Sequence, residues 1–334
     1  MKKNIFQFVF LLIFLLVPIS VFAEEPLGDF NFNPKESSHP YDIVNSKGEV
    51  IKYGDYSKNS INLNNETESF IGTGELNPIF VGDLLKENYV ELMPPKLNKD
   101  LTYNKITPNV VIGADGRNRV EDTAVFPFSA ISYIVLEWAD GSRGTCTGTL
   151  IGRDRVLTNG HCVVDPKTQK GITRATVYPG VSESTAWFGA YSVIDYFVTS
   201  NWINTGSISE DFAVLVLSSN AGERAGFTGI RQVNNLLNQN IGIFGYPGDL
   251  INRGESIDQY GMRGNVTNED GSIAYYTIDT APGQSGSAFL NTNNQIVGIH
   301  SSGYTDLRGN PLYNGGPKMN NFMFQFVTEA LNWL

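Results

Sequence analysis

From residue 110 to the C-terminus, the chain is a succession of short runs rich in β-branched and aromatic residues, with turn-forming residues between them. The run Ala130–Trp138, followed by Asp140–Gly141, is typical of a strand that ends in a hairpin turn. Similar runs occur at Thr145–Ile151, Arg155–Thr158, Phe212–Leu217, Ile241–Phe244, Ile273–Ile278 and Gln295–His300. Only the tail, residues 323–334, places apolar residues at strongly helical spacing. This pattern predicts an all-β fold, either a sandwich or a pair of barrels, with one C-terminal helix.

Length and charge narrow the possible classes of protein. The 334 residues, 41% of them hydrophobic, suffice for one large or two small domains. The net charge of -10 argues against nucleic acid as a partner, because proteins that bind nucleic acid usually carry a basic surface.

The first 23 residues have the layout of a signal peptide. Lys2 and Lys3 precede a largely apolar run from Ile5 to Val17, and Val21–Ala23 supplies residues of the size that a signal peptidase accepts. The apolar run is short for a membrane span, and no later stretch is long and apolar enough to be one. We therefore expect residues 1–23 to be removed during export, leaving a secreted, extracellular protein that is not held in a membrane.

The segment Thr280–Ser287, with the sequence TAPGQSGS, is a candidate for a nucleophilic serine. A serine hydroxyl is a weak nucleophile, so it needs a base beside it and two backbone N–H groups that bind the oxyanion of the attacked carbonyl. Ser285 would be the nucleophile, and the N–H groups of Gly283 and Ser285 would form the oxyanion hole. The alternative is a simple Ser/Gly turn between two strands, so the assignment depends on whether partner residues exist.

His161 is the candidate base. It follows the strand-like run Arg155–Thr158, whereas His39 lies in the N-terminal part of the chain and is given no role. Cys146 and Cys162, the only two cysteines, bracket His161, and in an exported protein such a pair predicts one disulfide. Closing a loop of that size would contribute about 3 kcal/mol and would hold the histidine loop in place. The alternative, a zinc site, lacks a fourth ligand nearby, so we expect no metal.

A carboxylate is needed to orient the imidazole and to stabilise its charged form. Asp211 directly precedes the apolar run Phe212–Leu217, where a partly buried acid would need a hydrogen-bond partner such as an imidazole N–H. An ordinary acidic turn is the alternative explanation of Asp211, and Asp195 is the alternative acid.

The order His161, Asp211, Ser285 and the segments around these residues resemble the chymotrypsin-fold serine proteases, and more closely the bacterial glutamyl endopeptidases. The similarity extends from about Val110 to the C-terminus. Its strongest segments are TNGHC (158–162), DFAV (211–214) and GQSGS (283–287). The resemblance implies two six-stranded antiparallel β-barrels with a Ser-His-Asp triad in the cleft between them, protein or peptide substrates, and no cofactor.

The resemblance also implies which residue precedes the cleaved bond. Glutamyl endopeptidases hold a Glu carboxylate with a histidine and a threonine, and His300 and Thr280 match these residues. Two hydrogen-bond donors in a shielded pocket would favour Glu over its neutral analogue. Two alternatives stay open. His300 could be a strand-end histidine without a substrate contact, and Asp279, six residues before Ser285, could bind Lys or Arg as in trypsin-like enzymes. We favour Glu because His300 would partly neutralise an acid at position 279.

Residues 24–109 differ in composition from the rest of the chain, since they contain no arginine and include Asn-, Ser- and Glu-rich stretches. They could form a flexible extension or a pro-segment that is removed after export, and their position before a protease-like region favours the pro-segment. The resemblance implies cleavage near Asn109–Val110, by an activating protease or by the protein itself, with the new α-ammonium of Val110 close to the specificity pocket. Gln284 stands where animal enzymes have the Asp that pairs with the new N-terminus, so activation must differ from theirs.

The expected organisation is a signal peptide at 1–23, a pro-segment at 24–109, an N-terminal barrel at 110–220, and a C-terminal barrel with the terminal helix at 221–334. The expected function is hydrolysis of peptide bonds after Glu and, more weakly, after Asp. A different class of function also stays open, namely an exported binding or toxin-like protein on a protease fold with one restricted target.

Overall fold

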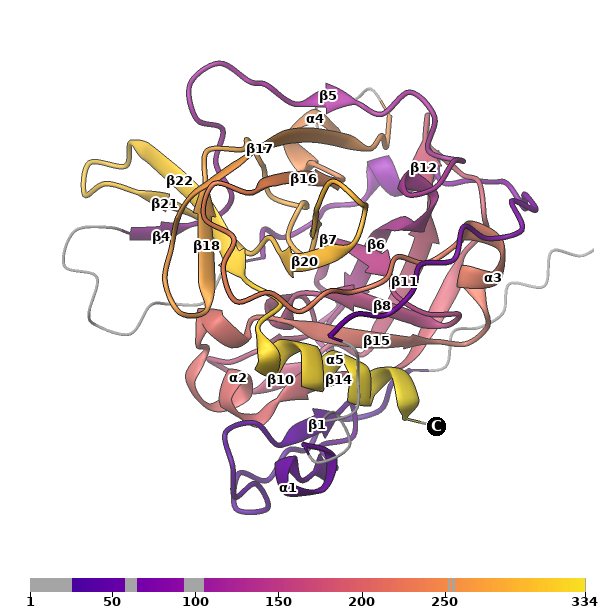
Figure 1. The fold of residues 1–334 in the computed structure, drawn as a ribbon. Helices are drawn as coiled ribbons and strands as arrows, with labels where there is room; N and C mark the ends of the chain where they lie inside the picture. The colour runs from indigo at the N-terminus through magenta and orange to yellow at the C-terminus, as the bar shows by residue number, and fades with distance from the viewer. Residues whose placement is uncertain (1–25, 58–64, 93–104, 252, 254–255, 334) are drawn as a thin grey trace, which may run out of the picture.

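The strand-rich part of the chain folds into two antiparallel sheets that lie side by side in the computed structural model (Figure 1). The structure describes residues 26–57, 65–92, 105–251, 253 and 256–333. The expected signal peptide, residues 1–23, lies outside these ranges. The predicted all-β class with one C-terminal helix is confirmed.

The first sheet closes into a barrel of six strands. The strand order is β11-β6-β7-β8-β15-β14, and β11 also pairs with β14. The bounds are β6 Ile131–Glu137, β7 Arg143–Leu150, β8 Arg155–Thr158, β11 Arg174–Pro179, β14 Tyr191–Thr199 and β15 Ala213–Leu217. Alternate residues of a strand face opposite sides, so Ala213, Leu215 and Leu217 join the barrel core while Val214 packs into a second cluster outside it. Burial on both faces explains the continuous apolar sequence of β15.

The second sheet follows the order β20-β19-β16-β17-β18-β22-β21-β4, and β5 pairs with β17. The bounds are β4 Lys105–Thr107, β5 Asn118–Arg119, β16 Asn240–Gly245, β17 Tyr260–Glu269, β18 Ile273–Tyr276, β19 Ala288–Leu290, β20 Ile296–Ile299, β21 Ser302–Thr305 and β22 Pro311–Pro317. A bridge between Gly298 and Lys318 joins β20 to the chain after β22. The pairing of β5 shows that this short piece of chain, within the range expected for the first barrel, belongs to the second sheet.

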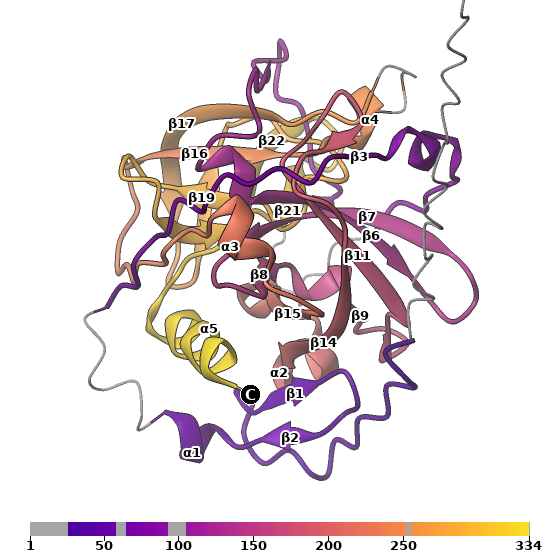
Figure 2. The ribbon, with the colours of Figure 1, turned by 90° about the vertical axis from the view of Figure 1, so that its right-hand side faces the viewer.

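Helix α5, Asn321–Asn332, covers the first barrel although it follows the second in the sequence (Figures 1 and 2). The side chain of Asn320 caps the helix by accepting a hydrogen bond from Met323 N at 2.9 Å. On its apolar face, the ring of Phe326 lies 5.0 Å from that of Phe212, which precedes β15. The terminal helix therefore stabilises the barrel that carries β15.

The described parts of residues 26–107 pack onto both sheets. Their elements are β1 Ile43–Asn45, β2 Val50–Ile51, α1 Tyr53–Tyr56, β3 Ile79–Phe80, the 3-10 helix η2 Gly82–Lys86, and β4. β1 adds to the edge of the first sheet by pairing with β14, and β4 adds to the second by pairing with β21. Ile43, Val44 and Tyr56 are buried in the two cores. These parts are integral to the sheets, unlike the flexible extension considered from the sequence.

Shorter elements connect the strands: β9 Val164–Asp165, β10 Lys170–Gly171, β12 Val181–Ser182, β13 Thr185–Ala186, α2 Ser200–Thr205, α3 Ala221–Ala225, α4 Gly248–Ile251, and the 3-10 helices η3 Phe128–Ala130, η4 Gly160–Cys162 and η5 Ile208–Glu210. Within the part of the chain that the structure describes, no helix combines the length and the apolar character needed to cross a membrane.

Candidate active site

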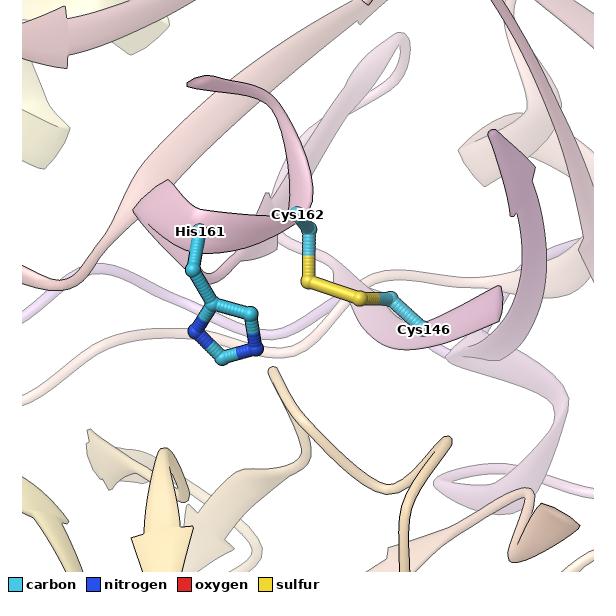
Figure 3. A group of neighbouring side chains, drawn as sticks. All are labelled: Cys146, His161 and Cys162. Atoms are coloured by element: carbon cyan, nitrogen blue, oxygen red, sulfur yellow. A yellow bond between two sulfur atoms is a disulfide. The ribbon is translucent and has the colours of Figure 1, made fainter. Parts of the chain in front are cut away.

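His161 lies on η4, directly after β8, and is 5% exposed. The predicted disulfide is confirmed: it joins Cys162 on η4 to Cys146 on β7 (Figure 3). The histidine loop is thus covalently tied to a core strand of the first barrel. Among the described residues, these three form the one group of His, Cys, Asp and Glu side chains close enough to share a metal ion. The two sulfurs are bonded to each other, so neither is a thiolate, and the group does not fit a metal site.

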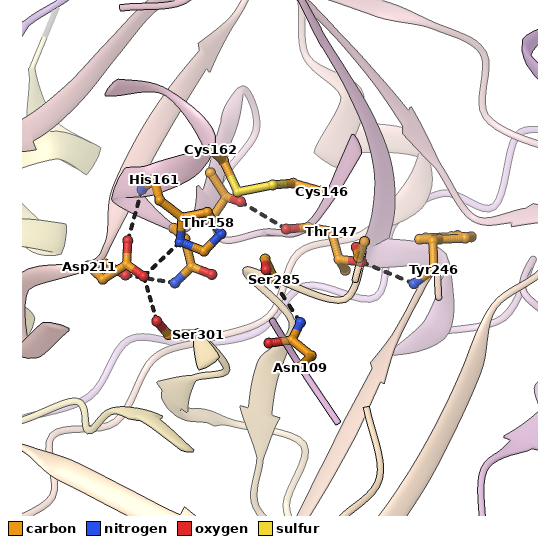
Figure 4. Close-up of a disulfide and its surroundings, with 12 residues drawn as sticks. Asn109, Cys146, Thr147, Thr158, His161, Cys162, Asp211, Tyr246, Ser285 and Ser301 are labelled. Carbon is orange, nitrogen blue, oxygen red and sulfur yellow. Dashed lines mark hydrogen bonds and ion pairs between the residues drawn. A yellow bond between two sulfur atoms is a disulfide. The ribbon is translucent and has the colours of Figure 1, made fainter. Parts of the chain in front are cut away.

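Asp211, between η5 and β15, is fully buried. Its Oδ2 lies 2.8 Å from His161 Nδ1, and its Oδ1 accepts a hydrogen bond from His161 N at 2.8 Å. Ser301 Oγ also donates to Oδ2 (Figure 4). Three donors around a buried carboxylate offset its loss of hydration and hold the imidazole in one orientation. Asp195, the alternative acid, instead accepts a hydrogen bond from Ser46 Oγ at 2.6 Å.

Ser285 lies in a tight turn before β19 that requires two glycines. Gly283 has φ +95° and Gly286 has φ +87°, and a Cβ at these positions would lie 2.5 Å from Tyr246 O and 2.2 Å from Thr147 O. Thr147 on β7 fastens the turn, since its N–H donates to Ser285 O and its Oγ1 to Gly283 O, both at 2.8 Å. A strand of the first barrel thereby positions the serine-bearing turn of the second.

The structure brings His161, Asp211 and Ser285 into one region (Figure 4). His161 Nε2 has no hydrogen-bond partner among the described residues. Ser285 Oγ instead accepts a hydrogen bond from Asn109 Nδ2 at 3.4 Å, and the same amide also donates to Ala281 O at 3.2 Å. The candidate nucleophile is therefore contacted by the residue that precedes the expected cleavage position. No sequence signal indicated this contact, because it joins residues far apart in the chain.

The backbone N–H groups expected to form the oxyanion hole, those of Gly283 and Ser285, donate no hydrogen bond to any described residue. Neighbouring N–H groups hold the turn instead: Gln284 N donates to Ala281 O at 3.0 Å, and Gly286 N donates to His300 O at 2.9 Å. Two unpaired N–H groups in one turn are available to bind a developing negative charge.

His300, directly after β20, is fully buried, and its Nδ1 lies 2.6 Å from Tyr276 Oη. Burial, with a smaller effect of nearby His161, lowers the pKa of His300 to about 3, so the imidazole is neutral. Burial also raises the pKa of Tyr276 well above its usual range, so the phenol keeps its proton and is able to donate a hydrogen bond to Nδ1. When it does, the proton of the neutral imidazole resides on Nε2.

His300 Nε2 and Thr280 Oγ1 have no hydrogen-bond partner among the described residues, although both residues are fully buried. Buried polar atoms are nearly always paired, and leaving one unpaired costs about 1–3 kcal/mol. Unpaired donors at a buried position are therefore typical of a place that a polar ligand fills.

Asp279, the acid of the alternative trypsin-like specificity, is 2% exposed and uses both carboxylate oxygens within the chain. Its Oδ1 accepts a hydrogen bond from Ile112 N at 2.7 Å, and its Oδ2 accepts one from Gly116 N at 2.8 Å. We expected His300 to offset this charge, but the two backbone N–H groups do so. The carboxylate anchors the segment after Val110.

Val110 lies beside Thr280, whose N–H donates to Val110 O at 3.2 Å. Asn314, buried on β22, accepts a hydrogen bond from Val110 N at 3.0 Å and donates one to Val110 O at 2.7 Å. Sequence reasoning did not identify Asn314, because a lone Asn within a strand carries no local signal of such a role. The uncut chain thus already places Val110 next to one of the expected pocket residues.

Comparisons with known proteins agree with this architecture. The Trypsin family model matches residues 127–322, more than half of the chain, so this protein belongs to the trypsin family. It is a serine endopeptidase, and its predicted similarity to glutamyl endopeptidases is confirmed. Over 307 residues it is 29% identical to the glutamyl endopeptidase of Bacillus licheniformis, a match that covers 89% of this chain and 84% of that protein.

Two further similarities define how far this relationship extends. The solved structure of a Glu endopeptidase in complex with MPD is 43% identical, has a TM-score of 0.63, and covers 67% of this chain and 100% of its own. A protein of Bacillus subtilis named extracellular metalloprotease is 24% identical over 311 residues, 91% of each chain. The metal in that name is not carried over to this chain, because its candidate group contains the disulfide.

Proposed function

We propose that this serine endopeptidase is exported and hydrolyses peptide bonds after Glu, and more weakly after Asp, with His161, Asp211 and Ser285 as its catalytic triad. One observation carries the specificity. His300 Nε2 and Thr280 Oγ1 are unpaired buried donors, whereas the carboxylate of Asp279 is already paired with backbone N–H groups. The expected pocket residues therefore offer donors for a substrate carboxylate, while the carboxylate of Asp279 is already in use within the chain.

The reaction begins with the serine hydroxyl. Asp211 Oδ2 accepts the N–H of His161 Nδ1, which leaves Nε2 without a proton and able to act as the base. As Ser285 Oγ attacks the substrate carbonyl carbon, its proton passes to His161 Nε2. The N–H groups of Gly283 and Ser285 then bind the oxyanion of the tetrahedral intermediate.

The second half of the reaction reverses the proton transfer. His161 donates the proton to the leaving amine nitrogen, the peptide C–N bond breaks, and an acyl ester forms on Ser285 Oγ. Water then attacks this ester with His161 again as the base, and the product acid leaves with Ser285 Oγ protonated. Asp211 stays ionised throughout and stabilises the imidazolium in both steps.

Discrimination between Glu and Gln rests on the two pocket donors. The Nε2–H of His300 and the Oγ1–H of Thr280 would both donate to a carboxylate, and such charge-assisted hydrogen bonds are stronger than those to a neutral amide. After cleavage between Asn109 and Val110, the new α-ammonium of Val110 would add a positive charge close to Thr280. Gln offers one acceptor oxygen and an amide nitrogen that cannot accept, so a site built from donors would favour Glu.

We also propose that the chain is made as a zymogen. In the uncut chain, β4 pairs with β21, so Thr107 lies opposite Gly303. A Cβ on Gly303 would lie 2.8 Å from Pro108 O, which shows how closely the two segments approach. Pro108 and Asn109 line the same cavity as Gly283 and Ser285. Cleavage after Asn109 would release this segment from the cavity.

The experiment that tests the proposal compares matched peptides with Glu, Asp, Gln, Lys or Arg before the scissile bond, using processed protein and its Ser285→Ala variant. We expect cleavage after Glu that is lost in the variant. Ser218→Ala, a change at an exposed serine, is the matched control and should keep full activity. Cleavage after Lys or Arg would assign the pocket to Asp279. Failure to cleave any peptide or to react with a fluorophosphonate would favour a binding protein on a protease fold.

A further inference from the structure

The residue before the nucleophile, Gln284, is fully buried and closes the turn that carries the expected oxyanion hole. Its side-chain Oε1 accepts a hydrogen bond from Ala281 N at 3.0 Å, while its own N–H donates to Ala281 O at 3.0 Å. These two bonds join the first and last residues of the turn Ala281–Gln284. The direction of the Gly283 N–H therefore depends on where the Gln284 side chain is held.

Arg117 holds that side chain, since its Nη1 donates to Gln284 Oε1 at 3.4 Å. Its guanidinium is fully buried and paired with Asp115 at 3.0 and 2.8 Å and with Asp249 at 3.0 and 2.7 Å. The five N–H groups of the guanidinium thus each have an acceptor, which fixes its plane. Hydrogen bonding to Arg117 lowers the pKa of the Asp115 carboxyl, so this part of the cluster stays ionised.

The other face of the turn is tied to the same cluster through Asp249. This residue lies on α4, whose first residue, Gly248, donates its N–H to Pro282 O at 2.6 Å. Arg117 therefore contacts the turn at Gln284 and also contacts the helix that holds Pro282. A movement of the guanidinium would break its contact with Gln284 and remove the ion pair with Asp249 on the helix that holds Pro282.

We propose that Arg117 is a positioning residue for the oxyanion hole, acting through Gln284, in place of the ion pair between Asp and a new N-terminus that animal enzymes use. The proposal rests on the proposed function, since it assumes that Gly283 and Ser285 bind the oxyanion. Arg117 makes these contacts in the uncut chain and is not freed by cleavage after Asn109. Formation of the turn is thereby separated from removal of the pro-segment.

The test uses two inhibitors of the processed enzyme with the same sequence ending in Glu. A peptide aldehyde forms a hemiacetal with Ser285 and places its oxyanion on the Gly283 and Ser285 N–H groups, whereas the corresponding peptide acid occupies the pocket without forming that adduct. In Arg117→Met we expect kcat to fall about 10- to 100-fold. Removing one oxyanion-hole donor outright lowers kcat by a similar or larger factor. KM should stay within about twofold, and the ratio of aldehyde affinity to acid affinity should fall with kcat.

Gln284→Met removes the hydrogen bond from Arg117 together with the one that Ala281 N donates to Oε1, so it should give the same pattern with a loss at least as large. The double variant should be no worse than Gln284→Met alone, because Arg117 acts through Gln284. Arg119→Met, which removes a surface arginine paired with Glu183 and Asp258, is the matched control and should leave the affinity ratio unchanged.

The outcomes separate a positioning role from a structural one. If Arg117→Met lowers only the melting temperature and the affinity ratio stays at the wild-type value, the proposal is wrong. If Arg117→Met does not fold, Gln284→Met decides by the same ratio, because it removes no charge from the cluster. If processed wild-type protein neither cleaves a Glu peptide nor reacts with a fluorophosphonate, the proposed function is wrong. The proposed role of Arg117 is then also wrong, because it assumes that function.

Discussion

The two halves of the candidate active site differ in how completely their polar groups are paired. On the first barrel, Asp211 receives three hydrogen bonds and fixes the imidazole of His161 through Nδ1. On the second sheet, Thr280 Oγ1 and His300 Nε2 have no partner among the described residues. The hydroxyl of Ser285 accepts a hydrogen bond from the amide of Asn109.

This difference indicates which hydrogen bonds of the candidate site form on folding and which would form only when a ligand binds. The proposed base and its acid need one geometry in every turnover, and their contacts are built within the chain, with the disulfide tying the histidine loop to β7. The proposed pocket has to exchange a substrate side chain for water repeatedly, which agrees with polar atoms that are unpaired in the protein alone. Four measurements can contradict or sharpen this comparison.

The largest effect should come from the paired carboxylate of Asp211. Asp211→Asn should lower kcat about 10⁴-fold, because an amide in this position favours the wrong tautomer of His161. Asp195→Asn is the matched control, since Asp195 bonds to Ser46 instead and its replacement should leave kcat unchanged. Steady-state kinetics on a Glu peptide measure both. A large loss of kcat in Asp195→Asn, with no loss in Asp211→Asn, would show that Asp195 is the catalytic acid instead of Asp211.

A smaller effect should appear when the segment before Val110 is still attached. Uncut protein should react with a fluorophosphonate about tenfold more slowly than processed protein, because the β4–β21 pairs and the Asn109 contact must first open. Asn109→Ala in the uncut chain should recover part of that rate. The rate of active-site labelling measures the effect, and equal rates in cut and uncut protein would contradict the zymogen proposal.

Removing one of the unpaired polar groups, Thr280 Oγ1, should change the specificity. Thr280→Val keeps the volume and removes one donor, so the preference for Glu over Gln should fall about 10- to 100-fold, the value of one hydrogen bond to a charged group. Activity on the Gln peptide should change little. Asp279→Asn is the informative comparison, because it should lower stability without creating or removing cleavage after Lys. An unchanged Glu-to-Gln ratio in Thr280→Val would remove Thr280 from the pocket.

Two buried groups, His300 and Glu210, should make the free energy of unfolding depend on pH in opposite directions. The pKa of His300 is lowered from 6.5 to about 3, so the free energy of unfolding should fall as pH falls from about 6.5 toward 3, where only the unfolded state gains the proton. Burial raises the pKa of Glu210 from 4.5 to about 7, so stability should fall as pH rises from about 4.5 through 7, by on the order of 3 kcal/mol.

Two variants in the Ser285→Ala background, which prevents self-digestion, separate these contributions. His300→Gln should flatten the acid side of the stability profile, and Glu210→Gln should flatten the side toward neutral pH. Chemical denaturation across the pH range measures both profiles. A profile that keeps its shape in either variant would show that the group titrates normally in the folded protein.

The sequence predicted those features that are determined by residues close together in the chain. Short β-branched runs predicted the strands, and β8 begins and ends at its predicted residues, because strand-forming composition and the turn residues beside it are properties of neighbouring residues. The disulfide was predicted from two cysteines in a chain with a predicted export signal. The glycines at 283 and 286 indicated a turn, and both have the positive φ that such a turn uses.

The contacts of the pocket could not be found in this way. Asn109 with Ser285, Asn314 with Val110, and Arg117 with Gln284 each join residues more than 150 positions apart. Asp279 shows the consequence, since its position in the sequence suited a trypsin-like pocket, while its hydrogen bonds to Ile112 and Gly116 use the carboxylate elsewhere.

The sequence by itself determined the β class, the disulfide and the order of the candidate catalytic residues, because composition, periodicity and motif spacing act over a few residues. Only the tertiary structure decided which polar atoms stay unpaired, which groups pair with the carboxylate of Asp279, and that the segment before Val110 pairs with β21. These outcomes depend on which polar groups come together when the barrel and the second sheet pack, because a buried polar group pairs with a partner within hydrogen-bond distance.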